Sequence, residues 1–192
     1  MRVAYLGPEG SYSSLAAAKL CPQGECVPYR SFPLAVESLL RSETDAAVLP
    51  VENTLQGAVT QNLDLLYANE SLYAVEEYLL PIEHRLIAPC GTQLGDIRRL
   101  FSHQQAILQC SRFIAEHLPQ AEVIYTDSTM QSLSLLKGKG DAGIVGSHVQ
   151  REGLCFLGGN IADERKNFTH FLLVKKGRDS LPAHSTRVYF AA

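Results

Sequence analysis

The sequence predicts an α/β protein of two lobes, each built on a small sheet flanked by helices. Two observations predict this class. Short β-like apolar runs alternate with stretches of helical periodicity, and one long extended segment, residues 72–88, interrupts the alternation near the middle of the chain. We interpret this segment, which is broken at Pro81, as a crossing between the lobes. A chain of 192 residues, 46% of them hydrophobic, can bury such a core.

Before the crossing, three β-like segments alternate with three helix-like segments. The expected strands, the last of which ends at Pro50, are residues 3–6, 26–29 and 45–49. The first expected helix, residues 14–20, is rich in alanine. The second follows Ser31, a residue type that caps helices, and the third follows Thr54 with apolar residues at helical spacing.

After the crossing the same alternation returns. The expected strands are residues 100–101, 123–125, 142–145 and 171–174. One helix is expected to follow Ser102 and run to His117, and another to run from Ser128 to a stop at Gly138. The second half therefore predicts another α/β sheet.

Hydroxyl or amide residues stand at five predicted junctions: Ser11, Asn53-Thr54, Ser102, Ser128 and Ser147. A helix N-terminus presents N–H groups that lack partners and attract anions. Ligands of open α/β sheets bind outside the carboxyl ends of the strands, where these junctions lie. Several junctions in one cleft would bind a small molecule that carries carboxylates.

Composition excludes several other functions. The net charge is −3 and the basic residues are scattered, so nucleic acid is not an expected partner. No stretch reaches 18 apolar residues and the first residues do not resemble a signal peptide, so we expect a cytoplasmic protein without a membrane anchor. The five cysteines show no CxxC pair or finger-like spacing, which predicts reduced, mostly buried thiols and no metal site.

Four segments of the chain form a set of motifs: residues 7–13, GPEGSYS; residues 50–57, PVENTLQG; residues 102–110; and residues 167–171. In this order they resemble the prephenate dehydratase family. The first is similar to its opening GPxG[ST][YF]S motif and the second to its PxEN[ST]xxG motif. Residues 102–110 resemble its SHPQ…QC segment and residues 167–171, NFTHF, its NxTRF segment. Shorter similarities occur at residues 82–84, 127–129 and 153–163. Together these motifs are far more specific than a single glycine pattern.

The resemblance implies a two-lobed periplasmic-binding-protein-like (type II) fold with the active site in the inter-lobe cleft. It implies a catalytic domain over residues 1–177, with lobe 1 at about 1–75 plus 160–177 and lobe 2 at about 76–159. Residues 178–192 resemble the start of the small regulatory ACT domain that commonly follows in this family. Homo-oligomers, dimers or tetramers, are also implied.

By the same resemblance Thr169 is the catalytic hydroxyl, which donates a proton to the leaving oxygen. The expected substrate-binding residues are Ser11, Tyr12, Asn53, Thr54, Gly57, Ser102, Gln105, Ser128, Thr129, His170 and Phe171. The chain departs from the family pattern twice. Gln104 replaces a proline, which affects loop stiffness, and His170 replaces an arginine. A histidine lacks the guanidinium fork, so the second departure bears on substrate binding more than on the fold.

The implied activity is that of a lyase that needs no cofactor or metal and converts prephenate to phenylpyruvate, CO2 and water in phenylalanine biosynthesis. Two alternatives stay open at this point. Arogenate, with an amino group in place of the keto group, would undergo the same chemistry. A non-catalytic two-lobed binding module would share the fold, and fold alone does not decide function.

Overall fold

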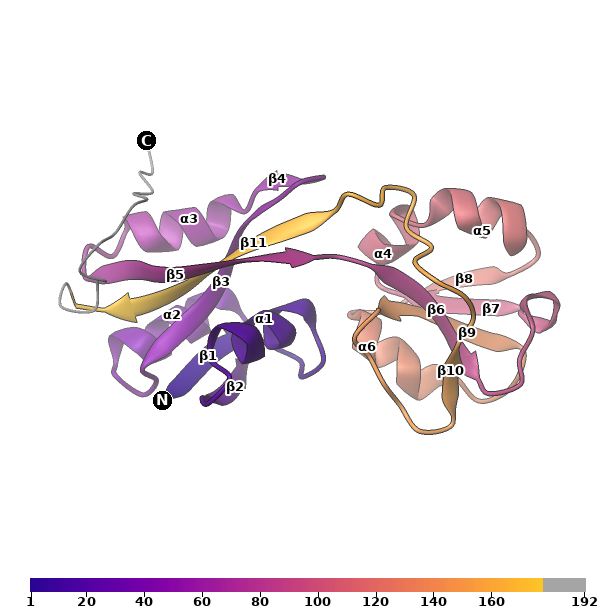
Figure 1. The fold of residues 1–192 in the computed structure, drawn as a ribbon, viewed down its shortest axis with the longest axis horizontal. Helices are drawn as coiled ribbons and strands as arrows, with labels where there is room; N and C mark the ends of the chain where they lie inside the picture. Colours follow the sequence, from indigo (N-terminus) through magenta and orange to yellow (C-terminus); the bar gives the residue numbers. More distant parts are fainter. Residues whose placement is uncertain (178–192) are drawn as a thin grey trace. The chain divides into compact units, whose positions relative to one another are not determined.

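The computed structural model describes residues 1–177, which form two compact units (Figure 1). Unit 1 contains residues 1–81 and 167–177, and unit 2 contains residues 82–166. The chain therefore crosses after Pro81 and returns after Lys166, whereas the sequence suggested limits near residues 75 and 160. The tail that resembles the start of an ACT domain, residues 178–192, lies outside the described residues.

Unit 1 is a mixed sheet of order β2-β1-β3-β11-β5, with the short β4 paired to β3. β1 pairs in parallel with β2 and β3, and β11 runs antiparallel to β3 and β5. Side chains of α2 and α3 pack in one hydrophobic cluster with β3 and β11. The strands are β1 (Arg2–Leu6), β2 (Glu25–Tyr29), β3 (Ala46–Asn53), β4 (Gly57–Ala58), β5 (Leu72–Pro81) and β11 (Phe168–Lys176), and the helices are α1 (Tyr12–Leu20), α2 (Phe32–Leu40) and α3 (Thr60–Tyr67).

Unit 2 is a second mixed sheet, of order β10-β6-β9-β7-β8. β7 pairs in parallel with β8 and β9, and β6 runs antiparallel to β9 and β10. Its main cluster joins Leu86, Leu100 and Ile144 of the sheet to Ile107 of α4. The strands are β6 (His84–Pro89), β7 (Arg99–Ser102), β8 (Glu122–Tyr125), β9 (Asp141–Gly146) and β10 (Leu154–Phe156), and the helices are η1 (Leu94–Asp96), α4 (Gln104–Leu108), α5 (Ser111–His117), α6 (Thr129–Ser132) and η2 (Leu133–Leu135).

Two of the five predicted junctions cap helices, and three do not. Ser11 accepts from the N–H of Ser14 at the start of α1, and Ser128 accepts from Gln131 at the start of α6. Ser102 instead ends β7 and donates its hydroxyl to the Ile144 carbonyl. A turn and β10, rather than a helix, follow Ser147.

The prediction of a helix directly after Thr54 is wrong. Residues 54–56 form a turn, Gly57 has a φ of 78°, and α3 begins only at Thr60. Glycine adopts this left-handed conformation without the steric cost that a side chain brings. The turn lets β4 fold back on β3, and this short hairpin left no clear signal in the hydrophobic pattern.

The prediction that Pro50 ends its strand is also wrong. β3 continues through Pro50 to Asn53. Proline cannot donate to a strand ladder, and the ladder is irregular at this place. His170 of β11 lies opposite Glu52, whereas the next residue, Phe171, lies opposite Pro50, so Val51 is left out of the register. The bulge allows the strand to pass the proline.

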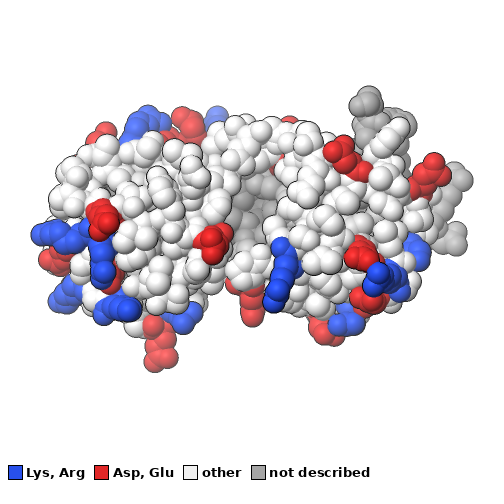
Figure 2. All heavy atoms as spheres, turned by 180° about the vertical axis from the view of Figure 1, so that it is seen from behind, with Lys and Arg blue, Asp and Glu red and all other residues white. Residues whose placement is uncertain are grey.

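The expected single helix from residue 103 to 117 is two short helices, α4 and α5, separated at Gln109 and Cys110. His103, rather than Ser102, caps α4, because its ring Nδ1 accepts from the N–H of Gln105 at 3.3 Å. Within residues 1–177 no helix is long and apolar enough to cross a membrane. Basic and acidic side chains are mixed over the face drawn in Figure 2.

A disulfide joins Cys90, just after β6, to Cys155 of β10. The prediction that all the thiols are reduced is therefore wrong for this pair. The two cysteines are 65 positions apart in the sequence and meet only because β10 pairs with β6, with Cys155 opposite Ala88. Cys21, Cys26 and Cys110 are free thiols.

We expect three reactive thiols in the denatured, unreduced protein and five after reduction. In the native protein Cys110 should react last, because burial raises the pKa of its thiol to about 12. Replacing both Cys90 and Cys155 by serine should lower the free energy of unfolding by about 2–4 kcal/mol, measured by denaturant titration. Five reactive thiols without reductant would contradict the disulfide.

His84, the first residue of β6, is a buried histidine, 4% exposed. Its Nε2 lies 2.7 Å from Oε1 of Gln109. Burial lowers the pKa of His84, and the hydrogen bond to Gln109 offsets this only in part. A neutral ring that donates Nε2–H to the amide oxygen fits this geometry. The bond joins two of the motif segments, residues 82–84 and 102–110.

The pH dependence of stability should report this histidine. The pKa of His84 is lower in the folded than in the unfolded chain, so the unfolded chain takes up the proton first as the pH falls. Its contribution to stability is full above a pH of about 6.5 and is lost as the pH falls toward the folded pKa, with a limiting slope of about 1.4 kcal/mol per pH unit. Denaturant unfolding of His84→Gln should therefore depend less on pH between 8 and 5. His117→Gln, at an exposed histidine, is the control that should keep the wild-type slope.

Candidate active site

Asn53, the last residue of β3, is the centre of the polar network in unit 1. Its side chain is 7% exposed. The Nδ2 group lies 2.8 Å from Oδ1 of Asn167, 2.9 Å from Oγ1 of Thr169 and 3.1 Å from the Phe168 carbonyl. The Oδ1 atom accepts from the N–H groups of the turn that follows, at Leu55 and Gln56. Contacts within the protein thus use both ends of the amide.

The pairing of β3 with β11 brings this network together. Thr169 lies directly opposite Asn53 in the antiparallel register. The next residue, Thr54, fixes the start of β11, because its N–H donates to the Phe168 carbonyl at 3.0 Å and its Oγ1 accepts from the Phe168 N–H at 2.8 Å. Asn167, only 1% exposed, precedes the strand and is held by Asn53. Two motif segments more than 100 positions apart therefore form one cluster.

This geometry leaves the hydroxyl hydrogen of Thr169 available for a further hydrogen bond. A threonine oxygen accepts hydrogen bonds through its lone pairs and carries one hydrogen. Because Asn53 donates to that oxygen, the hydroxyl hydrogen of Thr169 is left for another acceptor. Donation into a hydroxyl also polarises its O–H bond, so it becomes a better donor.

His170 contacts a carboxylate instead. Its Nε2 lies 2.8 Å from Oε2 of Glu77 on β5. Successive residues of a strand point to opposite faces, so His170 and Thr169 occupy different faces of the sheet. The face of His170 also carries Glu52, its partner on β3, and Leu79, its partner on β5. No motif indicated a role for Glu77, since only the strand register brings it close to His170.

The other predicted residues of unit 1 lie in several environments. Tyr12 is the first residue of α1, next to the cap Ser11, whose hydroxyl lies 3.2 Å from the Leu6 carbonyl. Gly57 is exposed in β4. Phe171 is buried in the core. The structure thus brings Asn53, Thr54 and Thr169 together, and it also draws in Asn167, which belongs to the motif but was not expected to have a role of its own.

The remaining predicted residues belong to unit 2. Ser102 is completely buried and bonded to the Ile144 carbonyl. Gln105 lies in the first turn of α4, and Ser128 and Thr129 are the cap and the first residue of α6. Substrate binding by these residues, and the expected cleft between the lobes, stay predictions. Within residues 1–177 no group of three or more histidine, cysteine or acidic side chains is arranged to hold a metal ion.

Comparison with known proteins gives the same family as the motifs. A family model described as prephenate dehydratase matches residues 3–179. A prephenate dehydratase of Lactococcus lactis subsp. lactis is 33% identical over 94% of this chain and 65% of its own length. Arogenate dehydratase 2 of Petunia hybrida is 37% identical over 92% of this chain and 45% of its own length. The chain spans about half to two thirds of the length of these relatives.

Solved structures with a similar fold include members of the same family. The prephenate dehydratase of Arthrobacter aurescens, in complex with L-Phe, superposes with a TM-score of 0.81 at 31% identity, over 92% of this chain and 60% of that chain. GqqA, described as a novel type of quorum quenching acylase, superposes with a TM-score of 0.79 at 26% identity, over 95% of this chain and 66% of that chain. A transporter substrate-binding domain from Clostridium difficile superposes with a TM-score of 0.51 at 9% identity, over 94% of this chain and 86% of that chain. The last match concerns the fold alone, and it agrees with the predicted periplasmic-binding-protein-like fold. The family model, the motifs and these relatives together establish that the chain belongs to the prephenate dehydratase family.

Proposed function

We propose that this chain catalyses the decarboxylating dehydration of prephenate to phenylpyruvate, CO2 and water. One observation carries the proposal. Thr169 Oγ1 receives the Asn53 amide at 2.9 Å and keeps its own hydrogen for donation, at the position where the family motif has its hydroxyl. The family membership of residues 3–179 supports the same activity.

The chemistry requires little from the protein beyond positioning and one proton. As the C–C bond to the departing carboxylate breaks, its electron pair enters the ring and expels the ring hydroxyl on the other side. That oxygen takes the Thr169 proton and leaves as water, and solvent then returns a proton to Thr169. Aromatisation of the ring drives the reaction. A weakly acidic hydroxyl transfers its proton only as basicity develops on the leaving oxygen, so we expect from it a rate factor of about 10²–10⁴.

Neutral groups would hold the remaining carboxylate. The N-terminus of α1, a nine-residue helix capped by Ser11, offers N–H groups of the kind that bind anions. His170 is engaged with Glu77 on the face of the sheet opposite Thr169. We therefore expect His170 to contribute less to substrate binding than the predicted helix termini.

Arogenate is the nearest alternative substrate, and the 37% identical Petunia relative carries the name arogenate dehydratase. An amino group in place of the keto group changes one local contact and leaves the chemistry at the ring unchanged. The ratio of kcat/KM on the two substrates decides between them. We propose prephenate because the Lactococcus relative, of which this chain covers a larger share, bears that name.

Acyl hydrolysis is a second candidate, because one structural neighbour is described as an acylase. A threonine nucleophile needs a base that removes its proton. Asn53 is instead an N–H donor to Thr169, which favours a proton donor over a nucleophile. The non-catalytic module predicts tight binding of prephenate without product. Incubation with prephenate while the ultraviolet absorbance of phenylpyruvate is followed identifies the dehydratase, and hydrolysis of an acylated substrate identifies the acylase.

Cytoplasmic location and a homo-oligomer stay predictions. The Cys90–Cys155 disulfide weighs against a permanently reducing compartment, since disulfides are rare in the cytosol and persist in oxidising environments. Thiol counts on protein taken directly from the source cells, quenched with an alkylating agent, address the compartment. Sedimentation of the purified protein addresses the oligomer.

Replacing Thr169 by alanine should lower kcat on prephenate by about 10²–10⁴, because the proton donor is lost. Thr169→Ser, which keeps the hydroxyl, is the matched control and should retain most of the activity. Both variants should unfold at nearly the wild-type denaturant concentration. Wild-type turnover in Thr169→Ala would remove this residue from its role, and an inactive wild-type protein would reject the proposed function.

A further inference from the structure

The last segment of unit 2, residues 157–166, leads back to unit 1 and lacks regular secondary structure. It is nevertheless hydrogen-bonded to the rest of unit 2. Its backbone N–H groups donate to three carbonyls of unit 2. Leu157 donates to Leu86 at 2.9 Å, Ile161 to His84 at 2.8 Å, and Asp163 to Gln109 at 2.8 Å. We call residues 157–164 the anchored segment.

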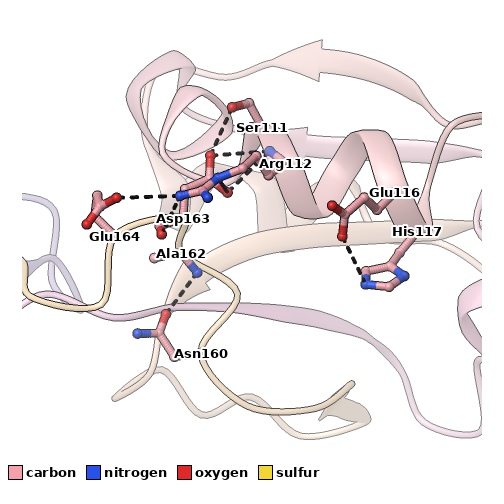
Figure 3. A network of polar contacts seen from close by, with 8 residues as sticks. All are labelled: Ser111, Arg112, Glu116, His117, Asn160, Ala162, Asp163 and Glu164. Carbon is pink, nitrogen blue, oxygen red and sulfur yellow. Dashed lines mark hydrogen bonds and ion pairs between the residues drawn. The ribbon is translucent and has the colours of Figure 1, made fainter.

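Asn160 fixes the middle of the anchored segment. Its Oδ1 accepts from the N–H of His84 at 3.2 Å. It also accepts from the N–H of Ala162 at 3.0 Å, the contact drawn in Figure 3. With the bond from Ile161 to the His84 carbonyl, Asn160 therefore ties the anchored segment to the first residue of β6.

Asp163 fixes the end of the anchored segment. Its carboxylate accepts from Oγ of Ser111 at 2.9 Å and from the N–H of Arg112 at 3.2 Å, at the start of α5. Arg112 in turn donates to the Asp163 carbonyl at 2.8 Å and reaches Glu164 at 3.4 Å (Figure 3). Cys110, the N-cap of α5, provides no side-chain cap, so Asp163 supplies one from another part of the chain.

The next buried residue is Asn167, which lies in the network of Asn53. Only exposed residues, Arg165 and Lys166 among them, separate Asp163 from it. The outgoing crossing is fixed in the same way, because Pro81 pairs with Phe168 on unit 1 and His84 is bonded to Asn160 and Ile161 on unit 2. Within each unit taken by itself, the residues that flank the two crossings are therefore bonded to each other.

We propose that Asp163 and Asn160 are positioning residues for the candidate catalytic strand: by anchoring the return segment they hold Asn167 and Thr169 in register with Asn53. This inference rests on the proposed function for its kinetic consequence, whereas the anchoring itself does not. Release of the anchor gives the chain before Asn167 more freedom, and misplacement of a reacting group by about 1 Å can cost 100-fold in rate.

Limited trypsin digestion tests the anchor, because Arg165 and Lys166 are exposed cleavage sites directly after it. Asp163→Ala should raise the rate of cleavage there by about tenfold, since loss of the hydrogen bonds to Ser111 and Arg112 increases the open population. Asp163→Asn, which keeps an acceptor oxygen, should restore slow cleavage in part. Glu164→Ala is the matched control, an exposed carboxylate whose loss should leave the rate unchanged. Asn160→Ala is the second variant should Asp163→Ala not fold.

Kinetics on prephenate test the positioning role. Asp163→Ala should lower kcat by about 10–100-fold with a smaller change in KM, while its unfolding midpoint stays near that of Glu164→Ala. Wild-type cleavage rates in both Asp163→Ala and Asn160→Ala would overturn the anchor. Faster cleavage with unchanged kcat would overturn the positioning role. If the wild-type protein lacks dehydratase activity, the proposed function and the kinetic role fail together, whereas the cleavage rates still decide whether the anchor exists.

Discussion

The hydrogen bond from Asn53 to Thr169 is the interaction on which the candidate site depends. It joins residues 116 positions apart, and the same amide also holds Asn167 and the Phe168 carbonyl. A buried amide whose groups are all paired is stable, whereas removal of one partner leaves the others unsatisfied in a poorly solvated place. The cluster therefore links the ends of β3 and β11 by hydrogen bonds, and it also orients the Thr169 hydroxyl. In the proposed mechanism, the side chain of Asn53 therefore supports both the fold and the proton donor.

The pleat of β11 separates two neighbouring residues of the motif. Thr169 lies with Asn53 on one face of the sheet, and His170 lies with Glu77 on the other. The family pattern treats these positions as one short motif, but in this chain they contact different groups. The hydrogen bond between His170 and Glu77 links the side chains of the neighbouring strands β11 and β5, and this link does not require contact with the substrate. The departure from arginine at this position is therefore compatible with the role proposed for Thr169 at the adjacent one.

Local signals in the sequence predicted several helix starts. Ser31 and Ser11 cap their helices because capping depends on the next three residues only. Features set by strand pairing could not be predicted. The passage of β3 through Pro50 depends on a bulge against β11, and the Cys90–Cys155 bond depends on the pairing of β10 with β6. Glu77 reaches His170 only through the β5 register. For the candidate site, the motifs predicted the residues, and the register of β3 with β11 added a contact that the motifs did not show, the hydrogen bond from Asn53 to Thr169.

A double-mutant cycle between Asn53 and Thr169, read as kcat on prephenate, tests the central claim most directly. If Asn53 acts through the Thr169 hydroxyl, Asn53→Ala should slow the wild-type enzyme by about 10–100-fold and should hardly slow Thr169→Ala further, because residues that act as a unit are not additive. All four proteins should be compared below their unfolding transitions, since Asn53 also supports the fold. Equal losses from Asn53→Ala in both backgrounds would contradict the account and would show that the two residues act independently.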